Sequence, residues 1–261
     1  MAASGHPAPG QPLARQRYLI LALLLVLAAA AWALLVWQAA TADPAMAMTP
    51  TMGMGASLFL AIWVAMMVAI MFPTAAPMIL TFARVQAGKR QQDQPFVPTW
   101  IFVAAYLFVW SALGVVAFLG ALLAERLASQ WPWAMDNAAR IGGILLIAAG
   151  LYQFTPFKQI CLSRCRSPMA FIMTSWRDGR DGAFRMGIEH GLYCAGCCWL
   201  LFVILFPLGM LNVAAMAAIT ALIFAEKSLP LGRWTSRIAG GLLAAGGALI
   251  IAMPGALPTT M

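Results

Sequence analysis

Three of the five cysteines of the chain fall within one short segment, together with one of its two histidines. The segment reads MGIEHGLYCAGCCW, from Met186 to Trp199, and continues directly into the apolar sequence LLFVILFPLGML. Thiolates and imidazole nitrogens are soft or borderline ligands that suit Cu(I) and zinc. The segment therefore predicts a metal or redox centre at the beginning of a hydrophobic helix.

The spacing of these residues places them on one side of that helix. At about 100° per residue, Met186, His190, Cys194 and Cys197 share a face, and Cys198 lies at its edge. Side chains three or four residues apart can both reach one ion. The alternative is that cysteines and small residues simply line a helix interface. We predict that His190, Cys194, Cys197 and Cys198 are metal ligands.

A second cysteine pair lies upstream, in the sequence CLSRCRSP. Cys161 and Cys165 are flanked there by Arg164 and Arg166, and a neighbouring guanidinium favours the thiolate form of a cysteine. Cytosolic thiols are normally reduced, which favours metal binding over a structural disulfide. Two unrelated thiols are the alternative to a predicted ligand pair.

An acidic residue near the end of a later apolar segment is a further candidate. Glu226, followed by Lys227, falls at about the depth of Tyr193 when residues are counted back from the tight turn before this segment. An ionisable residue inside a membrane helix is a functional candidate by default. We predict Glu226 as a ligand; the alternatives are a Glu226–Lys227 anchor at the interface and an ion pair with a nearby arginine.

Methionines are concentrated in the apolar sequence WVAMMVAIMFPTAAPM. On a helix, Met67, Met71 and Met78 lie within about 40° of one another and Met66 about 100° away. Thioether sulfur is a soft ligand, and it holds Cu(I) without burying a charge. Pro73 removes a backbone hydrogen bond and should kink this helix. We predict Met66, Met67 and Met71 as ligands, with ordinary packing as the alternative.

Four more methionines, Met46, Met48, Met52 and Met54, occur in MAMTPTMGM. A polar loop of this kind has little core for methionine to fill, which suits transient capture or release of copper. The alternative is a loop that dips into the membrane.

The elements that carry these residues are membrane helices. The chain is 63% hydrophobic and 9% charged, whereas soluble domains carry about 25% charged residues. A helix needs about 20 mostly apolar residues to cross a bilayer. Seven segments approach this: Tyr18 to Trp37, Ser57 to Phe82, Val97 to Leu123, Arg140 to Thr155, Ile188 to Leu208, Leu211 to Phe224 and Ile238 to Met253.

The distribution of basic residues predicts the orientation of these spans. Of the 16 Lys and Arg residues, only Arg126 and Arg140 fall between spans on the side opposite the N-terminus. The positive-inside rule then places the N-terminus in the cytoplasm. This asymmetry explains the net charge of +8 without nucleic-acid binding. The sequence ATA at Ala40 to Ala42 resembles a signal-peptidase site; cleavage there would leave six spans in the same orientation.

We therefore predict an all-α, polytopic membrane helix bundle. Residues 1–17 form a disordered cytoplasmic tail, 18–56 the first anchor and an exterior Met-rich loop, 57–255 a metal-binding transmembrane domain, and 256–261 an exterior tail. The longest soluble segment is expected to be a cytoplasmic loop from Phe157 to Arg185.

Three elements in order resemble one known family. These are the WxxM…MxPxxxP helix that begins at Trp63, the CLSRCRSP loop, and GxxHGLYCAGCCW followed by EK at Glu226 and Lys227. From about Ser57 to Arg237 the chain resembles the bacterial family of predicted metal-binding integral membrane proteins. The resemblance implies copper handling, because some members are membrane copper chaperones for periplasmic or membrane-bound copper oxidases. The family helix carries a double Met before its proline, whereas Ile70 precedes Met71 here.

The predicted function is that of a non-enzymatic, multi-pass protein of the bacterial inner membrane. It would bind Cu(I), with zinc less favoured, and load a copper oxidase, in contact with lipid and without nucleic acid. A membrane thiol-disulfide carrier using Cys194, Cys197 and Cys198 is the second hypothesis, although a disulfide within one helix is geometrically demanding. The third is an assembly subunit without metal, for which Cys-to-Ser changes would be silent.

Overall fold

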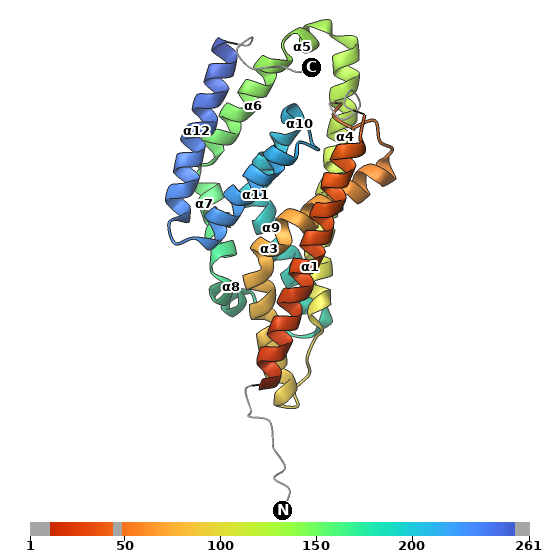
Figure 1. The fold of residues 1–261 in the computed structure, drawn as a ribbon. Helices are drawn as coiled ribbons and strands as arrows, with labels where there is room; N and C mark the ends of the chain where they lie inside the picture. The colour runs from red at the N-terminus through yellow and green to blue at the C-terminus, as the bar shows by residue number, and fades with distance from the viewer. Residues whose placement is uncertain (1–10, 44–48, 254–261) are drawn as a thin grey trace, which may run out of the picture.

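The protein is predominantly helical in the part that its computed structural model describes, residues 11–43 and 49–253, and no strand occurs there (Figure 1). This confirms the predicted all-α class. The helices are α1 Gln11–Thr41, α3 Ala56–Gln91, α4 Thr99–Gln130, α5 Pro132–Asp136, α6 Ala138–Tyr152, α7 Pro156–Arg166, α8 Pro168–Ser175, α9 Gly179–Val203, α10 Leu205–Leu208, α11 Val213–Ser228 and α12 Gly232–Ala252.

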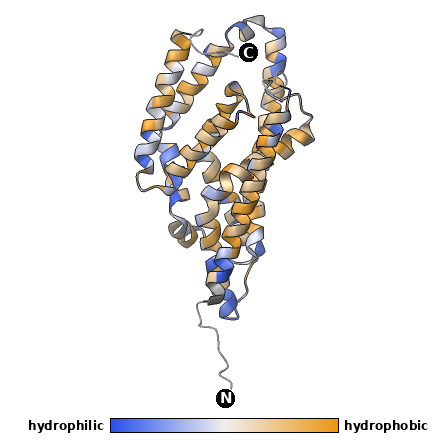
Figure 2. Ribbon diagram, viewed as in Figure 1, coloured by the Kyte–Doolittle hydropathy of each residue, from blue (hydrophilic) through white to orange (hydrophobic). Residues whose placement is uncertain are grey.

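Long apolar helices dominate the described chain, as the hydropathy colouring shows (Figure 2). Within the described residues, five segments are long and apolar enough to cross a membrane: α1, α3, α4, the α9–α10 segment and α12. Large apolar side chains such as Leu23, Val116 and Leu242 are exposed on the outside of the bundle. These features are compatible with a multi-pass membrane protein.

Two of the seven predicted spans are shorter than a full crossing. The fourth corresponds to α6, which ends at Tyr152 and is followed after a bend of 64° by α7. The sixth corresponds to α11, which has 16 residues. At 1.5 Å per residue such a helix extends about 24 Å, less than the hydrocarbon core of about 30 Å. Taken together, the bent α6–α7 pair is long and apolar enough for one broken span or a re-entrant element.

The interior of the bundle is built around α3 and α9. In their most apolar 18-residue windows, 61% of residues are buried in α3 and 50% in the α9–α10 segment, against 22% in α1 and α4 and 17% in α12. α3 packs against α1, α4 and α11, and α9 packs against α4 and α7. Residues on the shared side of α3 and α9 are therefore the best shielded from the surroundings.

Close approach of α9 to α4 depends on a small residue. A Cβ atom at Gly187 would lie 2.5 Å from the backbone oxygen of Phe102 and 2.6 Å from the Cβ of Ala105. The backbone oxygen and the Ala105 Cβ are both held by the α4 backbone, so neither can move without a shift of the helix. Small residues allow membrane helices to pack at short range, and here they set the distance between the cysteine-bearing helix and α4.

The segment from Phe157 to Arg185, which we expect to be a cytoplasmic loop, is largely helical. It folds into α7, α8 and the start of α9, and α7 packs against α9. Thr155 begins α7 as its N-cap, with its Oγ1 accepting a hydrogen bond from the backbone nitrogen of Lys158, and Pro156 follows in the first turn. These are favourable helix-start residues. Lys158, although basic, is fully buried, so its charge does not mark an exposed loop.

Candidate metal centre

α9 turns its sulfur-bearing face into the protein, as the helical spacing predicted. Met186, His190, Cys194, Cys197 and Cys198 are all at most 2% exposed. The helix begins at Gly179, earlier than the span predicted from hydropathy. His190 therefore lies about three turns inside the helix, rather than near its first residue.

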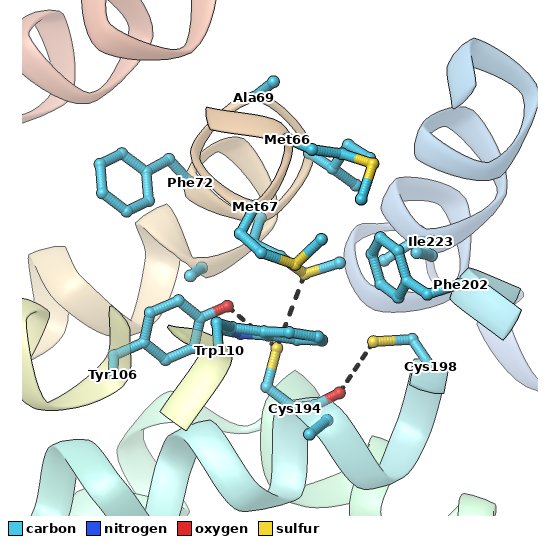
Figure 3. Close-up of a cluster of buried hydrophobic side chains, with 14 of the residues drawn as sticks. Met66, Met67, Ala69, Phe72, Tyr106, Trp110, Cys194, Cys198, Phe202 and Ile223 are labelled. Carbon is cyan, nitrogen blue, oxygen red and sulfur yellow. Dashed lines mark hydrogen bonds between the residues drawn. The ribbon is translucent and has the colours of Figure 1, made fainter. Parts of the chain in front are cut away.

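Side chains from three other helices lie close to the thiol of Cys194 in α9. Its Sγ lies 3.0 Å from the hydroxyl oxygen of Tyr106 in α4, 3.8 Å from Sδ of Met71 in α3 and 3.0 Å from Nζ of Lys227 in α11. Figure 3 shows Cys194 below the α3 methionines and beside Tyr106. The thiols of Cys197 and Cys198 donate to the Cys194 carbonyl oxygen at 3.1 and 2.9 Å.

α7 adds a thiol from a separate helix. The side chain of Cys165 is half-buried and packs against the core that contains Cys194, Cys197 and Cys198, because α7 packs against α9. Cys161, one turn earlier, is also buried, and its Sγ packs beside Gly196 on α9. We refer to Met71, Cys165, Cys194, Cys197 and Cys198 as the sulfur cluster. All five cysteines of the chain are free thiols.

The sulfur cluster is not preformed around one ion. Within residues 11–43 and 49–253, no three His, Cys, Asp or Glu side chains are arranged so that they could hold a metal. The thiols are neighbours, yet they do not converge in the tetrahedral manner that structural zinc requires. Two thiolates and the Met71 thioether form a smaller, softer set, of the kind that suits Cu(I).

The other predicted α3 ligands line the same interior. Met66, Met67 and Met71 are at most 2% exposed, and Figure 3 shows Met66 and Met67 on the side of α3 that faces Cys194 and Cys198. α3 continues through Pro73 without interruption. The hydroxyl of Thr74 donates to the Met71 carbonyl oxygen at 3.0 Å.

The His190 ring lies among three aromatic side chains and contacts none of the thiols. Its ring stacks on Phe102 and Tyr106, with centroids 5.9 and 5.5 Å apart, and meets the edge of Phe171 at 5.6 Å. Neither ring nitrogen has a hydrogen-bond partner among the described residues. A buried imidazole without partners is costly, and it is one helical turn from Cys194.

Glu226 pairs with a lysine, not with an arginine or with the neighbouring Lys227. Its Oε2 lies 2.8 Å from Nζ of Lys158, and the two side chains are 1% and 0% exposed. The other carboxylate oxygen has no partner in the described part of the chain. Arg166 contacts the backbone oxygen of Glu226 at 2.7 Å. The ion pair joins α7 to α11 beside the sulfur cluster.

Two polar contacts of the cluster were not singled out from the sequence. Tyr106 lies in an unremarkable apolar segment, and nothing in its sequence surroundings identifies it. Lys227 was noted only as part of the EK pair, although its amine contacts the Cys194 thiol. Its position at the end of an apolar segment could have identified Lys227 as a candidate site residue, because ionisable residues are rare in such segments.

The predicted exterior methionine group is only partly described. Met46 and Met48 lie outside the described residues. Met52 is 4% exposed and joins the hydrophobic core, while Met54 is half-buried. Glu125 anchors the loop by accepting hydrogen bonds from the nitrogen and hydroxyl of Thr51 at 2.8 and 2.7 Å. Met52 thus packs in the core rather than extending into a polar loop.

Comparison with known proteins gives one finding. The model of a family described as PpoB2, copper chaperone, matches residues 60–250. This range includes α7, α9 and α11 and all five residues of the sulfur cluster. No curated protein and no solved structure matches the chain.

Proposed function

Because the chain belongs to the PpoB2 copper-chaperone family, we propose that it holds Cu(I) as cargo in the sulfur cluster and delivers it to a cuproenzyme. It does so as an integral protein of the bacterial inner membrane with a cytoplasmic N-terminus. The client is a membrane or periplasmic copper oxidase. The protein transfers an ion and catalyses no conventional reaction.

One observation carries this proposal: soft sulfur ligands from three helices come together in the buried interior. Cys194 and Cys197 supply thiolates, Met71 supplies a thioether 3.8 Å from the Cys194 sulfur, and Cys165 supplies a thiol from α7, where it packs against the same core. Sulfur ligands select Cu(I) over hard cations. Bringing them from separate helices makes retention of copper dependent on the folded bundle.

The remaining predicted ligands surround the cluster and suit passage of the ion. Cys161 lies one turn before Cys165 on α7, and Met66 and Met67 lie on the inner side of α3. The unpartnered His190 is on the same helix as Cys194. We propose these residues as transient ligands, and Glu226 as the partner that holds Lys158, and hence α7, in place.

The test is the metal content of detergent-purified protein offered Cu(I) under reducing conditions, read by mass spectrometry. Wild type should retain copper stoichiometrically, and a Cys194/Cys197/Cys198 triple Ser variant should retain none. Met78→Leu, a buried substitution on α3 beyond the cluster, serves as the matched control and should bind like wild type. Absence of copper from the wild type would overturn the proposal.

The packing of Cys165 against the core that contains Cys194 and Cys197 also favours a second candidate, a thiol-disulfide carrier. A disulfide between α7 and α9 avoids the geometric demand of a Cys-x-x-Cys bridge within one helix. Mild oxidation followed by peptide mapping would then find a Cys165–Cys194 or Cys165–Cys197 bridge. Failure to trap either bridge, while copper binds stoichiometrically, would eliminate this candidate.

A further inference from the structure

Lys227 is the one cation that contacts the sulfur cluster in the described part of the chain. Its Nζ lies 3.0 Å from Sγ of Cys194 and 3.9 Å from Sδ of Met71. Among the described residues, no carboxylate oxygen lies within 4 Å of this amine, since the two ion pairs found there are Lys89–Asp178 and Lys158–Glu226. The charge of Lys227 is therefore directed at sulfur.

Three other basic residues of α7 and α12 have partners outside the cluster or are exposed. Lys158 is neutralised by Glu226 at 2.8 Å. Arg166 donates to the backbone oxygens of Glu226 and Leu229, each at 2.7 Å. Arg233 is exposed. Of these basic groups, Lys227 is the one that contacts a thiol of the cluster.

That charge decides which cation completes a neutral site. An unbalanced charge in a low-dielectric interior is expensive. When two cysteines lose their protons to solvent on metal binding, two thiolates and the Lys227 ammonium leave a single negative charge. A monovalent ion brings the sum to zero, whereas a divalent ion leaves a positive excess. A third thiolate would neutralise the excess charge of a divalent ion. Among the described residues, however, no three such ligands are placed so that they could hold one metal ion.

We propose that Lys227 is a specificity-determining residue that selects monovalent Cu(I) over divalent Zn(II) at the Cys194 thiolate. This inference rests on the proposed function and adds to it the charge of the preferred cargo. Lys227 does not ligate the ion. It acts as a fixed positive charge that makes a two-thiolate site neutral only with a monovalent cation.

The experiment is a competition between the two metals in the full-length protein. Purified wild type and variants are equilibrated with equimolar Cu(I) and Zn(II) under reducing conditions, and both metals are quantified by mass spectrometry. Lys227→Leu removes the charge without adding a sulfur ligand, and Lys227→Gln is a second neutral variant in case the first does not fold. Lys227→Arg retains the charge. Arg233→Met removes a charge from an exposed residue as the matched control.

Wild type, Lys227→Arg and Arg233→Met should retain copper with little zinc. In both neutral variants the ratio of bound zinc to bound copper should rise by about tenfold or more. The reason is that a unit charge 3.0 Å from the Cys194 sulfur changes the binding free energy of a cation by more than a tenfold change in affinity represents. An unchanged ratio in the folded neutral variants would overturn the inference while leaving the copper-chaperone function intact. Wild type without bound copper would overturn both.

Discussion

At the scale of single residues, the candidate site depends on Cys194 and its contacts. Its thiol touches a thioether, a phenol and an amine, each from a different helix. A serine at this position would keep the volume but lose the soft donor that Cu(I) requires. In the proposed site these residues therefore differ in role: the sulfur atoms would ligate the ion, and Lys227 would set the charge.

We expect Met71→Leu to weaken Cu(I) binding by about tenfold, equal to about 1.4 kcal/mol. The thioether is lost, while the volume changes so little that stability should fall by less than about 1.5 kcal/mol. Competition with a chromogenic Cu(I) chelator measures the affinity. Met78→Leu is the control, because Met78 is equally buried on the same helix. Equal losses in both variants would assign Met71 to packing.

Removing one partner of the buried ion pair should be costly. Glu226→Gln leaves the Lys158 charge uncompensated, and we expect a loss of about 3–5 kcal/mol in stability. The double variant Lys158→Met/Glu226→Gln should recover a large part of that loss, since no buried charge remains. Thermal unfolding in detergent compares the three proteins. A double variant no more stable than Glu226→Gln would contradict a purely electrostatic coupling of the two side chains.

At the scale of elements, two helices set the geometry of the centre. α7 inserts beside α9 and packs Cys165 against the core that contains the α9 thiols, and the Lys158–Glu226 pair fixes α7 against α11. α9 in turn approaches α4 closely at Gly187. The Tyr106–Cys194 contact exists because this approach is short.

A single methyl group at Gly187 should therefore disturb the centre from a distance. Gly187→Ala places a Cβ 2.5 Å from the Phe102 backbone oxygen, so α9 must shift away from α4. We expect lower thermal stability and weaker Cu(I) retention. Gly120→Ala on α4 is the control, because nothing lies within 4 Å of its added Cβ, and the helix-propensity gain of about 1 kcal/mol should make it neutral or stabilising. Wild-type copper retention in Gly187→Ala would show that close α4–α9 contact is not needed.

At the scale of the whole molecule, the arrangement encloses its polar groups within an apolar exterior. The ion pair, the imidazole and the thiols lie between α3, α4, α7, α9 and α11, while the lipid-compatible surface of α1, α4 and α12 carries exposed Leu and Val side chains. Figure 1 shows α6 and α12 side by side at one edge and α1 beside α3 at the other. The candidate centre lies between these two pairs.

The proposed orientation can be tested with single cysteines on opposite ends of the bundle. Ser129 and Gln92 are both exposed; Ser129 lies in the last turn of α4, and Gln92 lies before the start of α4. With the N-terminus in the cytoplasm, a membrane-impermeant maleimide should label Ser129→Cys from the periplasm and not Gln92→Cys. Wild type, in which four native thiols are buried and Cys165 is half-buried, measures the background. The reverse labelling pattern would invert the proposed direction of every segment.

The local sequence was sufficient for the features that depend on periodicity and composition. The 3.6-residue repeat placed His190, Cys194 and Cys197 on one face of a helix, and burial confirms that face. High apolar content identified the helical membrane class. The motif residues around Cys194 and Cys161 indicated the copper-chaperone family, which the family match confirms. Each of these conclusions rests on neighbours in sequence.

The tertiary structure alone decided which distant side chains meet. Sequence spacing does not predict that Lys227 reaches Cys194, that Lys158 pairs with Glu226, or that Cys165 packs from α7 against the core that contains the α9 thiols. These contacts arise from helix packing, which depends on the summed fit of many apolar side chains and on close approach at Gly187. A basic residue such as Lys158 looks exposed when its segment is read by charge. Lys158 is buried in an ion pair only because the fold places the Glu226 carboxylate beside its amine.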